Sequence, residues 1–260
     1  MKQLLTRCIG ALLLVMASTG WSAEVLVTGD ATLSNTYTRV NAFYDGLAGH
    51  SSSIINTEVT AGDLAGIELF WAVQPANDYT NSELTAMAGF LAGGGRIAFM
   101  GEHGSGFGEA ENIRINSALS FLGSAMSIVN SQIQDSGGQT ALRANGEILD
   151  HDLTAGVDSY NYAAFAPILG APEVLMLGHN LTSVMMGFEN IGAGSIFLIT
   201  DQNVFDAGRL DAGDNQQMFE NLLLADTGAP PPPGTTDVPL PATLWLMGLG
   251  LAVLYRRRQH

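Results

Sequence analysis

The sequence has 260 residues and a formal net charge of −15 at pH 7, with 47 % hydrophobic and 13 % charged residues. Average soluble proteins carry roughly 25 % charged residues, and disordered or coiled-coil chains combine more charge with fewer apolar residues, so the composition excludes both classes. All acidic residues lie between Glu24 and Asp237, accompanied by five arginines and no lysine. The resulting negative electrostatic field repels the phosphate backbones of nucleic acids, and we therefore expect no nucleic-acid partner.

Residues 1–23 have the pattern of a secretory signal peptide. Lys2 and Arg7 precede a short apolar stretch at 8–17, and small residues suit cleavage near 20–23. A retained N-terminal membrane anchor is the alternative. The only cysteine, Cys8, leaves with the signal, so the exported part has no thiol for a disulfide, a nucleophile or a metal ligand.

Residues 24–226 are predicted to form one exported domain in which strand and helix patterns alternate. The predicted strands are Val25–Thr28, Ser53–Val59, Ile67–Val73, Arg96–Met100, Val174–Leu177, Ser183–Phe188 and Ser195–Thr200. Stripes at i, i+3, i+4 and i+7 predict helices around Val40–Leu47, Leu84–Leu91 and Ile115–Leu122, with a last helix at Asn215–Leu224. Residues 130–172 are less periodic and are expected to hold a hairpin or an irregular insert.

This alternation with short loops predicts the α/β class, with a mostly parallel central sheet and helices on both faces. The inner strands should be Val25–Thr28, Ile67–Val73, Arg96–Met100 and Ser195–Thr200. Thr80 and Glu83 form a capping-box pattern that should begin the helix containing Leu84.

The C-terminus combines a proline-rich linker at 227–237 with an apolar segment at 240–255. As a helix this segment would be about 24 Å long, slightly short of a ~30 Å hydrocarbon core, which snorkelling arginines could complete. We therefore predict a transmembrane helix, preceded by the motif Val238-Pro239-Leu240-Pro241-Ala242 and followed by Arg256, Arg257 and Arg258. The positive-inside rule places these arginines in the cytoplasm. A plain tail anchor is the alternative.

The order of motif, apolar helix and arginine cluster at 238–260 resembles the PEP-CTERM sorting signal of Gram-negative bacteria, in its VPLPA form with Leu240 in place of Glu. The resemblance implies recognition by an exosortase, a membrane-bound intermediate with the domain in the periplasm, and transfer to the cell surface or extracellular matrix. Extracellular polysaccharide is a further expected partner.

The segments Ala88–Phe99, His151–Val157, Gly192–Phe197 and Asn221–Leu223 resemble the class I glutamine amidotransferase-like superfamily, which has a flavodoxin-like fold. Its amidotransferases carry a cysteine nucleophile after the strand that here ends at Met100. This chain instead has Gly101-Glu102-His103-Gly104. The amidotransferase activity therefore does not carry over, and no cofactor is expected.

Polar residues follow the predicted strands, where ligands gather in open α/β sheets. The candidate ligand-binding residues are Asp30, Gln74, Glu102, His103, Asp201, Gln202 and Asn203. Their carboxylates, imidazole and amides suit a hard divalent cation or a hydrogen-bonded sugar. The alternative is that they cap helices and turns.

Other motifs are weaker. Ser105 lacks the glycines of a nucleophile elbow, and a triad of Ser105, His151 and an aspartate is the alternative for this residue. The glycine-rich stretch 101–108 has no following lysine to bind phosphate, and the acidic stretch 201–214 has no EF-hand spacing.

Our leading hypothesis is an exported, surface-targeted α/β domain without catalytic residues that serves in binding or matrix assembly. One alternative is an exported hydrolase or carbohydrate-active enzyme that uses the strand-end carboxylates. Another is a scaffold stabilised by a divalent metal.

Overall fold

The computed structural model describes residues 23–29, 34–134, 139–206 and 208–225. A nine-stranded sheet organises this part of the chain, in the order β2-β1-β3-β4-β11-β10-β8-β5, with β9 also paired to β10. The sheet is mixed: its first five strands run parallel, and the remaining strands pair antiparallel.

The parallel strands are β2 (Ser51–Ile54), β1 (Glu24–Gly29), β3 (Leu69–Val73), β4 (Arg96–Met100) and β11 (Gly194–Ile199). The four predicted inner strands are thus neighbours in one sheet, as expected. The strand predicted at Ser53–Val59 is wrong in its bounds, because β2 covers Ser51–Ile54 and the chain leaves the sheet before Val59. This strand lies at the sheet edge, where polar serines are tolerated and the apolar pattern marks its ends poorly.

The antiparallel strands are β5 (Ser127–Ile128), β8 (Ile168–Leu169), β9 (Glu173–Leu177) and β10 (Val184–Ile191). The less periodic region, where a hairpin or an irregular insert was expected, contains a separate antiparallel two-stranded sheet of β6 (Thr140–Leu142) and β7 (Ser159–Asn161). Short 3-10 helices occur at η1 (Arg143–Asn145), η2 (Asp152–Thr154) and η3 (Gln202–Phe205).

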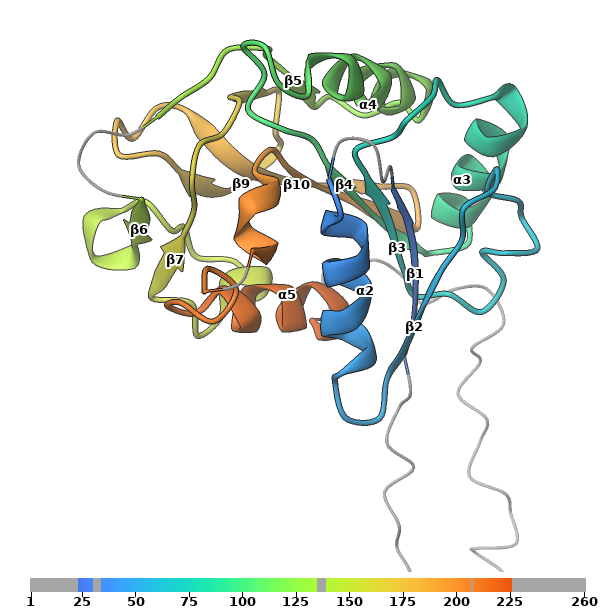
Figure 1. Ribbon diagram of the computed structural model, residues 1–260, viewed down its shortest axis with the longest axis horizontal. Helices are drawn as coiled ribbons and strands as arrows, with labels where there is room; N and C mark the ends of the chain where they lie inside the picture. Colours follow the sequence, from blue (N-terminus) through green and yellow to red (C-terminus); the bar gives the residue numbers. More distant parts are fainter. Residues whose placement is uncertain (1–22, 30–33, 135–138, 207, 226–260) are drawn as a thin grey trace, which may run out of the picture.

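In the described part of the chain, helices cover both faces of the sheet (Figure 1). Helices α2 (Thr36–Asp45) and α5 (Asn215–Leu224) pack on one face, and α3 (Asn81–Ala92) and α4 (Glu109–Phe121) pack on the other. The predicted capping box begins α3, with the Thr80 side chain accepting from the Glu83 amide and the Glu83 side chain accepting from the Thr80 amide.

Alternation along the strands divides the core into two halves. In β3, Trp71 and Val73 face the half that contains α2 and α5, whereas Phe70 and Ala72 face the half that contains α3 and α4. Because successive strand residues point to opposite faces, fully apolar central strands bury both of their sides. Trp71 is completely buried.

No helix among the described residues is long and apolar enough to cross a membrane. The predicted signal peptide, the proline-rich linker and the predicted transmembrane helix at 240–255 lie outside those residues.

Candidate functional site

The carboxyl ends of β3, β4 and β11 meet at one edge of the sheet. The strands are in register, with Val73 opposite Met100 and Met100 opposite Ile199. The residues that follow these ends therefore come together, and we call Gln74, Glu102, Asp201 and Gln202 the strand-end cluster. All four are buried, and Gln74, Glu102 and Asp201 are fully inaccessible to solvent.

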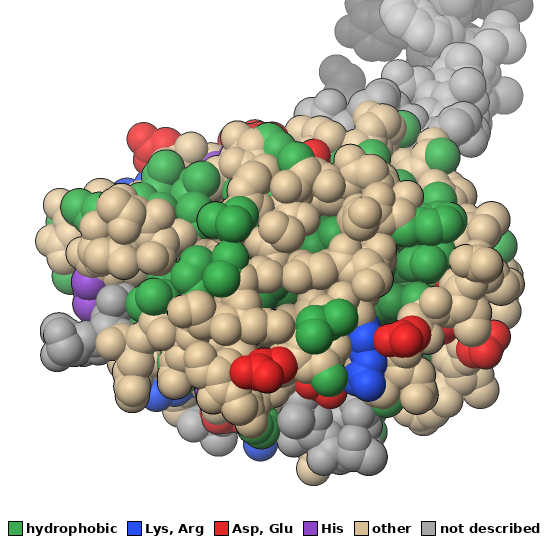
Figure 2. Space-filling model, turned by 90° about the horizontal axis from the view of Figure 1, so that it is seen from above, with side chains coloured by type: hydrophobic (Ala, Val, Ile, Leu, Met, Phe, Trp, Pro, Cys, Tyr) green, Lys and Arg blue, Asp and Glu red, His purple; other side chains and the backbone are tan. Residues whose placement is uncertain are grey.

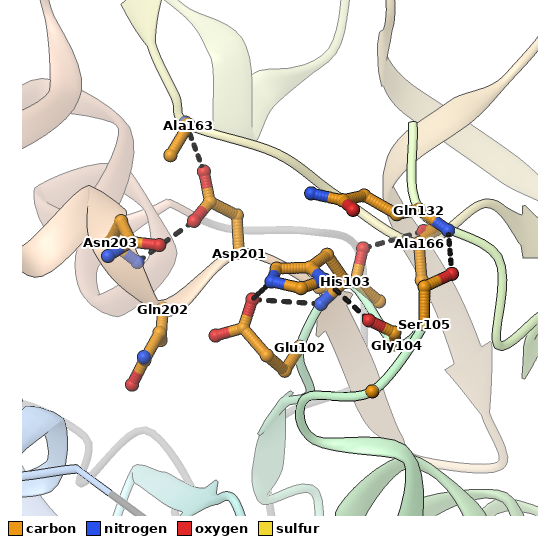
Figure 3. Close-up of polar contacts among 12 residues, drawn as sticks. Glu102, His103, Gly104, Ser105, Gln132, Ala163, Ala166, Asp201, Gln202 and Asn203 are labelled. Atoms are coloured by element: carbon orange, nitrogen blue, oxygen red, sulfur yellow. Dashed lines mark hydrogen bonds and ion pairs between the residues drawn. The ribbon is translucent and has the colours of Figure 1, made fainter. Parts of the chain in front are cut away.

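Glu102 is held by hydrogen bonds at both its backbone and its carboxylate. Its Oε1 accepts from the His103 amide at 2.8 Å, the backbone N–H of Gln202 also donates to the carboxylate, and Gln74 Nε2 lies 3.4 Å from Oε2. Asn112 on α4 accepts from the Glu102 amide at 2.9 Å and donates to its carbonyl at 2.7 Å. These contacts fix the backbone directly after β4, and Figure 3 shows the contact between the Glu102 carboxylate and His103.

Asp201 connects two separate segments of backbone. Its Oδ1 accepts from the Asn203 amide at 2.9 Å, which caps η3, and its Oδ2 accepts from the Ala163 amide at 2.6 Å. Figure 3 shows the carboxylate directed between these two partners. Asp201 is thus an N-cap and also a link to the loop before β8.

Both carboxyl groups titrate above their ordinary range. Burial raises the pKa of Glu102 to about 8, assisted by the charge of Asp201 and opposed by the amides of His103 and Gln202. Burial also raises the pKa of Asp201 to about 6, opposed by the amides of Ala163 and Asn203 and by Arg209. Two buried carboxyls near each other disfavour double ionisation, so Glu102 is the group that keeps its proton at neutral pH.

The two glutamines extend the network to the start of α2. Ser34 Oγ donates to Gln74 Oε1 at 2.7 Å, and Thr36 Oγ1 donates to Gln202 Oε1 at 2.9 Å. Gln74 adopts a φ of 46°, which is uncommon for a residue with a side chain. The network therefore holds a strained backbone at this edge.

His103 lies at the rim of the cluster, with its side chain about 20 % exposed. Its Nδ1 contacts the Gly104 carbonyl at 2.5 Å, its Nε2 lies 3.8 Å from Glu102 Oε1, and its ring stacks on Phe107 with centroids 5.7 Å apart. The exposed Ser105, with a φ of 56°, accepts from the Gln132 amide at 3.0 Å. This rim is the accessible part of the site.

The structure brings five predicted site residues together: the four of the strand-end cluster and His103 at its rim. Asn203 contributes its amide, but its side chain turns away and donates to Asp206 at 2.9 Å. Asp30 lies outside the described residues. The sequence predicts that these residues bind a divalent cation or a sugar or, as the alternative, cap helices and turns; in the structure Glu102 and Asp201 are enclosed and hydrogen-bonded to backbone amides.

Sequence reasoning missed the partners Ser34, Thr36, Asn112 and Ala163. For one of them, Asn112, the sequence pattern contained an indication. Asn112 lies three residues before Ile115 on the buried stripe of α4, and it is itself fully buried. A polar residue on an apolar stripe must find hydrogen-bond partners, and a strand-end loop supplies them.

The weaker candidates do not form sites in the described part of the chain. Ser105 and His151 are not paired: His151 Nε2 contacts Glu173 Oε2 at 2.9 Å, and its Nδ1 accepts from the Leu153 amide. Asp214 accepts from the Asp158 and Ser159 amides, and these bonds lower its pKa. No group of three or more His, Cys, Asp or Glu side chains that could hold a metal ion occurs among the described residues.

An open hollow of about 470 Å³ lies elsewhere, beside η2, and shares no residue with the strand-end cluster. Two of its lining side chains, Arg143 and His151, already have partners. Arg143 donates to the carbonyls of Thr154 and Val157 and to Asp150, and His151 contacts Glu173. We therefore assign the candidate site to the carboxyl edge, by which we mean the side of the sheet where β3, β4 and β11 end.

Residues 237–259 match the family model of the PEP-CTERM protein-sorting motif. This motif implies export, sorting by an exosortase, and delivery to the cell envelope or surface. It covers the C-terminal segment and leaves the α/β domain unassigned. No curated protein matches the chain in sequence.

Solved structures resemble the domain in fold. The N-terminal domain of mmIFT52 aligns with a TM-score of 0.58 at 16 % identity, over 77 % of this chain and 95 % of that one. The cytoplasmic protein STM1381 of Salmonella typhimurium LT2 aligns with a TM-score of 0.58 at 10 % identity, over 77 % and 98 %. STM3548 of Salmonella typhimurium aligns with a TM-score of 0.54 at 10 % identity, over 76 % and 97 %. At these identities the likeness shows the α/β fold alone.

Proposed function

We propose that the chain is an exosortase substrate whose α/β domain is displayed at the cell surface or in the extracellular matrix. The sorting motif at 237–259 is the observation that carries this proposal. In the proposed sequence, the signal at 1–23 directs export, and the helix at 240–255 holds an inner-membrane intermediate with the domain in the periplasm. The exosortase then removes or exchanges the tail.

We further propose that the domain binds a partner and does not catalyse a reaction. The carboxylates of Glu102 and Asp201 are enclosed and accept hydrogen bonds from backbone amides. Buried carboxylates that stabilise a fold are satisfied in this way. The resemblance to the glutamine amidotransferase-like superfamily supports the same view, because Glu102 and its neighbours occupy the place of the cysteine nucleophile.

Extracellular polysaccharide is the partner that we propose for the carboxyl edge. Figure 2 views the molecule from the side of the strand carboxyl ends and shows polar and apolar groups mixed, with few Lys or Arg side chains. Of the described arginines, Arg39 pairs with Asp206, and Arg114 pairs with Glu111 and Asp78. A surface of this kind suits an uncharged polyhydroxyl chain better than an anionic one.

Sorting can be tested in the bacterium that makes the protein. Mass spectrometry of surface-released protein should find no peptide from Leu244 to His260. A chain carrying Pro239→Ala and Pro241→Ala should instead stay in the inner membrane, as should the natural chain in an exosortase deletion strain. A variant with two prolines of the linker changed, Pro231→Ala and Pro232→Ala, is the control and should be sorted normally. An intact tail on mature surface protein would overturn the proposal.

Binding can be tested with the surface-released protein and the polysaccharide purified from the same cells. His103→Ala, at the carboxyl edge, should weaken binding. His50→Ala is the matched control, since His50 is also half-buried but lies directly before β2, at the opposite edge of the sheet from His103. Equal binding by both variants and the natural protein would place the binding surface elsewhere.

An exported hydrolase is the second candidate function, and the raised pKa of Glu102 favours it. A carboxyl group that is still protonated near neutral pH suits general acid catalysis. Incubation with the same polysaccharide should then release reducing ends, and Glu102→Gln should abolish this release while leaving the fold intact. Polysaccharide that stays intact after incubation argues for binding alone.

A further inference from the structure

Arg96, the first residue of β4, joins the end of the last helix to the middle of the sheet. Its guanidinium donates to the carbonyls of Leu222 and Ala225, the latter at 3.2 Å, and its Nε donates to Ser195 Oγ at 3.2 Å. Leu222 lies in the last turn of α5, and Ala225 is its C-cap. One side chain therefore connects β4, β11 and the carboxyl end of α5.

The contact suits the chemistry of a helix terminus. The last carbonyls of a helix have no partner within the helix and carry partial negative charge, which a guanidinium satisfies well. The Arg96 guanidinium also lies 5.9 Å from the centre of the Phe188 ring on β10. It is half-buried, so solvent screens these interactions only in part.

The position of this contact relates it to the sorted tail. Ala225 is the last described residue, and the sorting motif follows at 237–259. Tension on an anchored tail therefore reaches the described part of the chain at Ala225. Without the Arg96 contacts, this tension would detach α5 from its carboxyl end, whereas β4 lies between two parallel neighbours that resist extraction.

We propose that Arg96 is a mechanical clamp that transfers tension from the C-terminal anchor into the central strand β4. Because Arg96 begins β4 and Glu102 follows its end, the clamp and the strand-end cluster lie at opposite edges of the sheet. A domain under tension then presents its carboxyl edge away from the anchor. That the clamp carries tension in the cell rests on the proposed surface anchoring. The resistance of α5 to a pull on the C-terminus does not depend on it.

Single-molecule pulling on the full chain in detergent tests this proposal. Cys8→Ser removes the only natural thiol, and Gln132→Cys, at the exposed carboxyl edge, provides one handle. The second handle is either the C-terminus or Ala65→Cys, in the exposed turn before β3. With the C-terminal handle, Arg96→Ala should detach α5 at least about tenfold faster at constant force, because several charge-assisted hydrogen bonds are lost.

Two controls separate a clamp from general stabilisation. With the Ala65→Cys handle, which bypasses the tail, Arg96→Ala should change the rupture rate far less. Arg143→Ala removes an arginine that also donates to two backbone carbonyls, Thr154 and Val157, and it should leave the tail-handle rate near that of the natural chain. An equal effect of Arg96→Ala in both geometries, or no effect with the C-terminal handle, would overturn the proposal. Neither result depends on sorting or polysaccharide binding.

Discussion

The Oδ2 atom of Asp201 lies 2.6 Å from the amide nitrogen of Ala163, a residue 38 positions earlier in the chain. This bond ties the end of a parallel strand to the loop that leads into the antiparallel part of the sheet. Removing it should therefore affect the whole domain. Asp201→Ala leaves two amides, those of Ala163 and Asn203, without their acceptor, at a cost of about 3 kcal/mol in the free energy of unfolding.

Asp201→Asn keeps one acceptor oxygen and should cost about half as much. Urea unfolding followed by circular dichroism measures both values. Asp45→Ala, an exposed aspartate on α2, is the control and should change the free energy by less than about 0.5 kcal/mol. Indistinguishable midpoints for Asp201→Ala and Asp45→Ala would contradict the proposed link.

Stability should fall as the pH rises from about 4.5 to about 8. The pKa of Glu102 rises from 4.5 to about 8 on folding, so the folded state keeps a proton that the unfolded chain has already released. The stabilising contribution is complete below the unfolded value and is lost as the pH rises through the folded value. Asp201 acts in the same direction between 3.8 and about 6.

Glu102→Gln imitates the protonated carboxyl and should flatten the decline between pH 6 and pH 8. Melting temperatures measured across this range provide the readout. Glu58→Gln, at an exposed position, should keep the slope of the natural chain. A Glu102→Gln curve parallel to the natural one would show that Glu102 ionises normally.

Gly108→Ala should be one of the most damaging single-methyl additions in the domain. Gly108 has a φ of 77°, and a Cβ there would lie 2.3 Å from Glu102 Cβ. The positive φ costs an alanine about 1–2 kcal/mol of backbone strain, and the overlap must in addition displace Glu102. Together they should lower the free energy of unfolding by more than about 3 kcal/mol.

Gly106→Ala is the matched comparison, because Gly106 has a φ of 95° but no atom within 4 Å of an added Cβ. It should show the backbone strain alone. Differential scanning calorimetry of the two variants separates strain from overlap, and similar melting temperatures would mean that Glu102 moves away freely.

Thr80→Ala should remove the capping box of α3 and cost about 1 kcal/mol. Thr85→Ala, on the exposed part of the same helix, removes a hydroxyl that donates to the Asn81 carbonyl and should be nearly neutral or slightly stabilising. Denaturant midpoints of the two variants should therefore differ, and equal midpoints would count against the cap.

The central strands of the parallel half were predictable because they bury both faces and are mostly apolar, whereas the serine-rich edge strand β2 was placed with wrong bounds. Val27, Trp71 and Phe197 lie in apolar runs that indicate buried strands, and all three are fully buried. The antiparallel half was harder, since β5 and β8 are two-residue strands with no periodicity to detect. Their pairing depends on contacts such as that between Ile168 and Val184, which no local pattern reveals.

The candidate site was predictable in location but not in character. The rule that parallel strand ends meet at one edge placed Gln74, Glu102 and Asp201 together correctly. Whether such carboxylates are open or enclosed depends on distant partners, including the Ala163 amide and the Asn112 side chain. The positive φ of Gln74 likewise reflects tertiary constraints that its residue type does not indicate.

The burial of Trp71 has an optical consequence. Its indole is surrounded by the rings of Tyr44, Phe197, Phe205 and Phe219, with centroids 5.9–6.4 Å away. The other two tryptophans, Trp21 and Trp245, lie in the predicted signal peptide and sorting tail. A fully processed chain would therefore carry a single fluorophore of this type at its centre, and its emission would shift to longer wavelength when water enters the core.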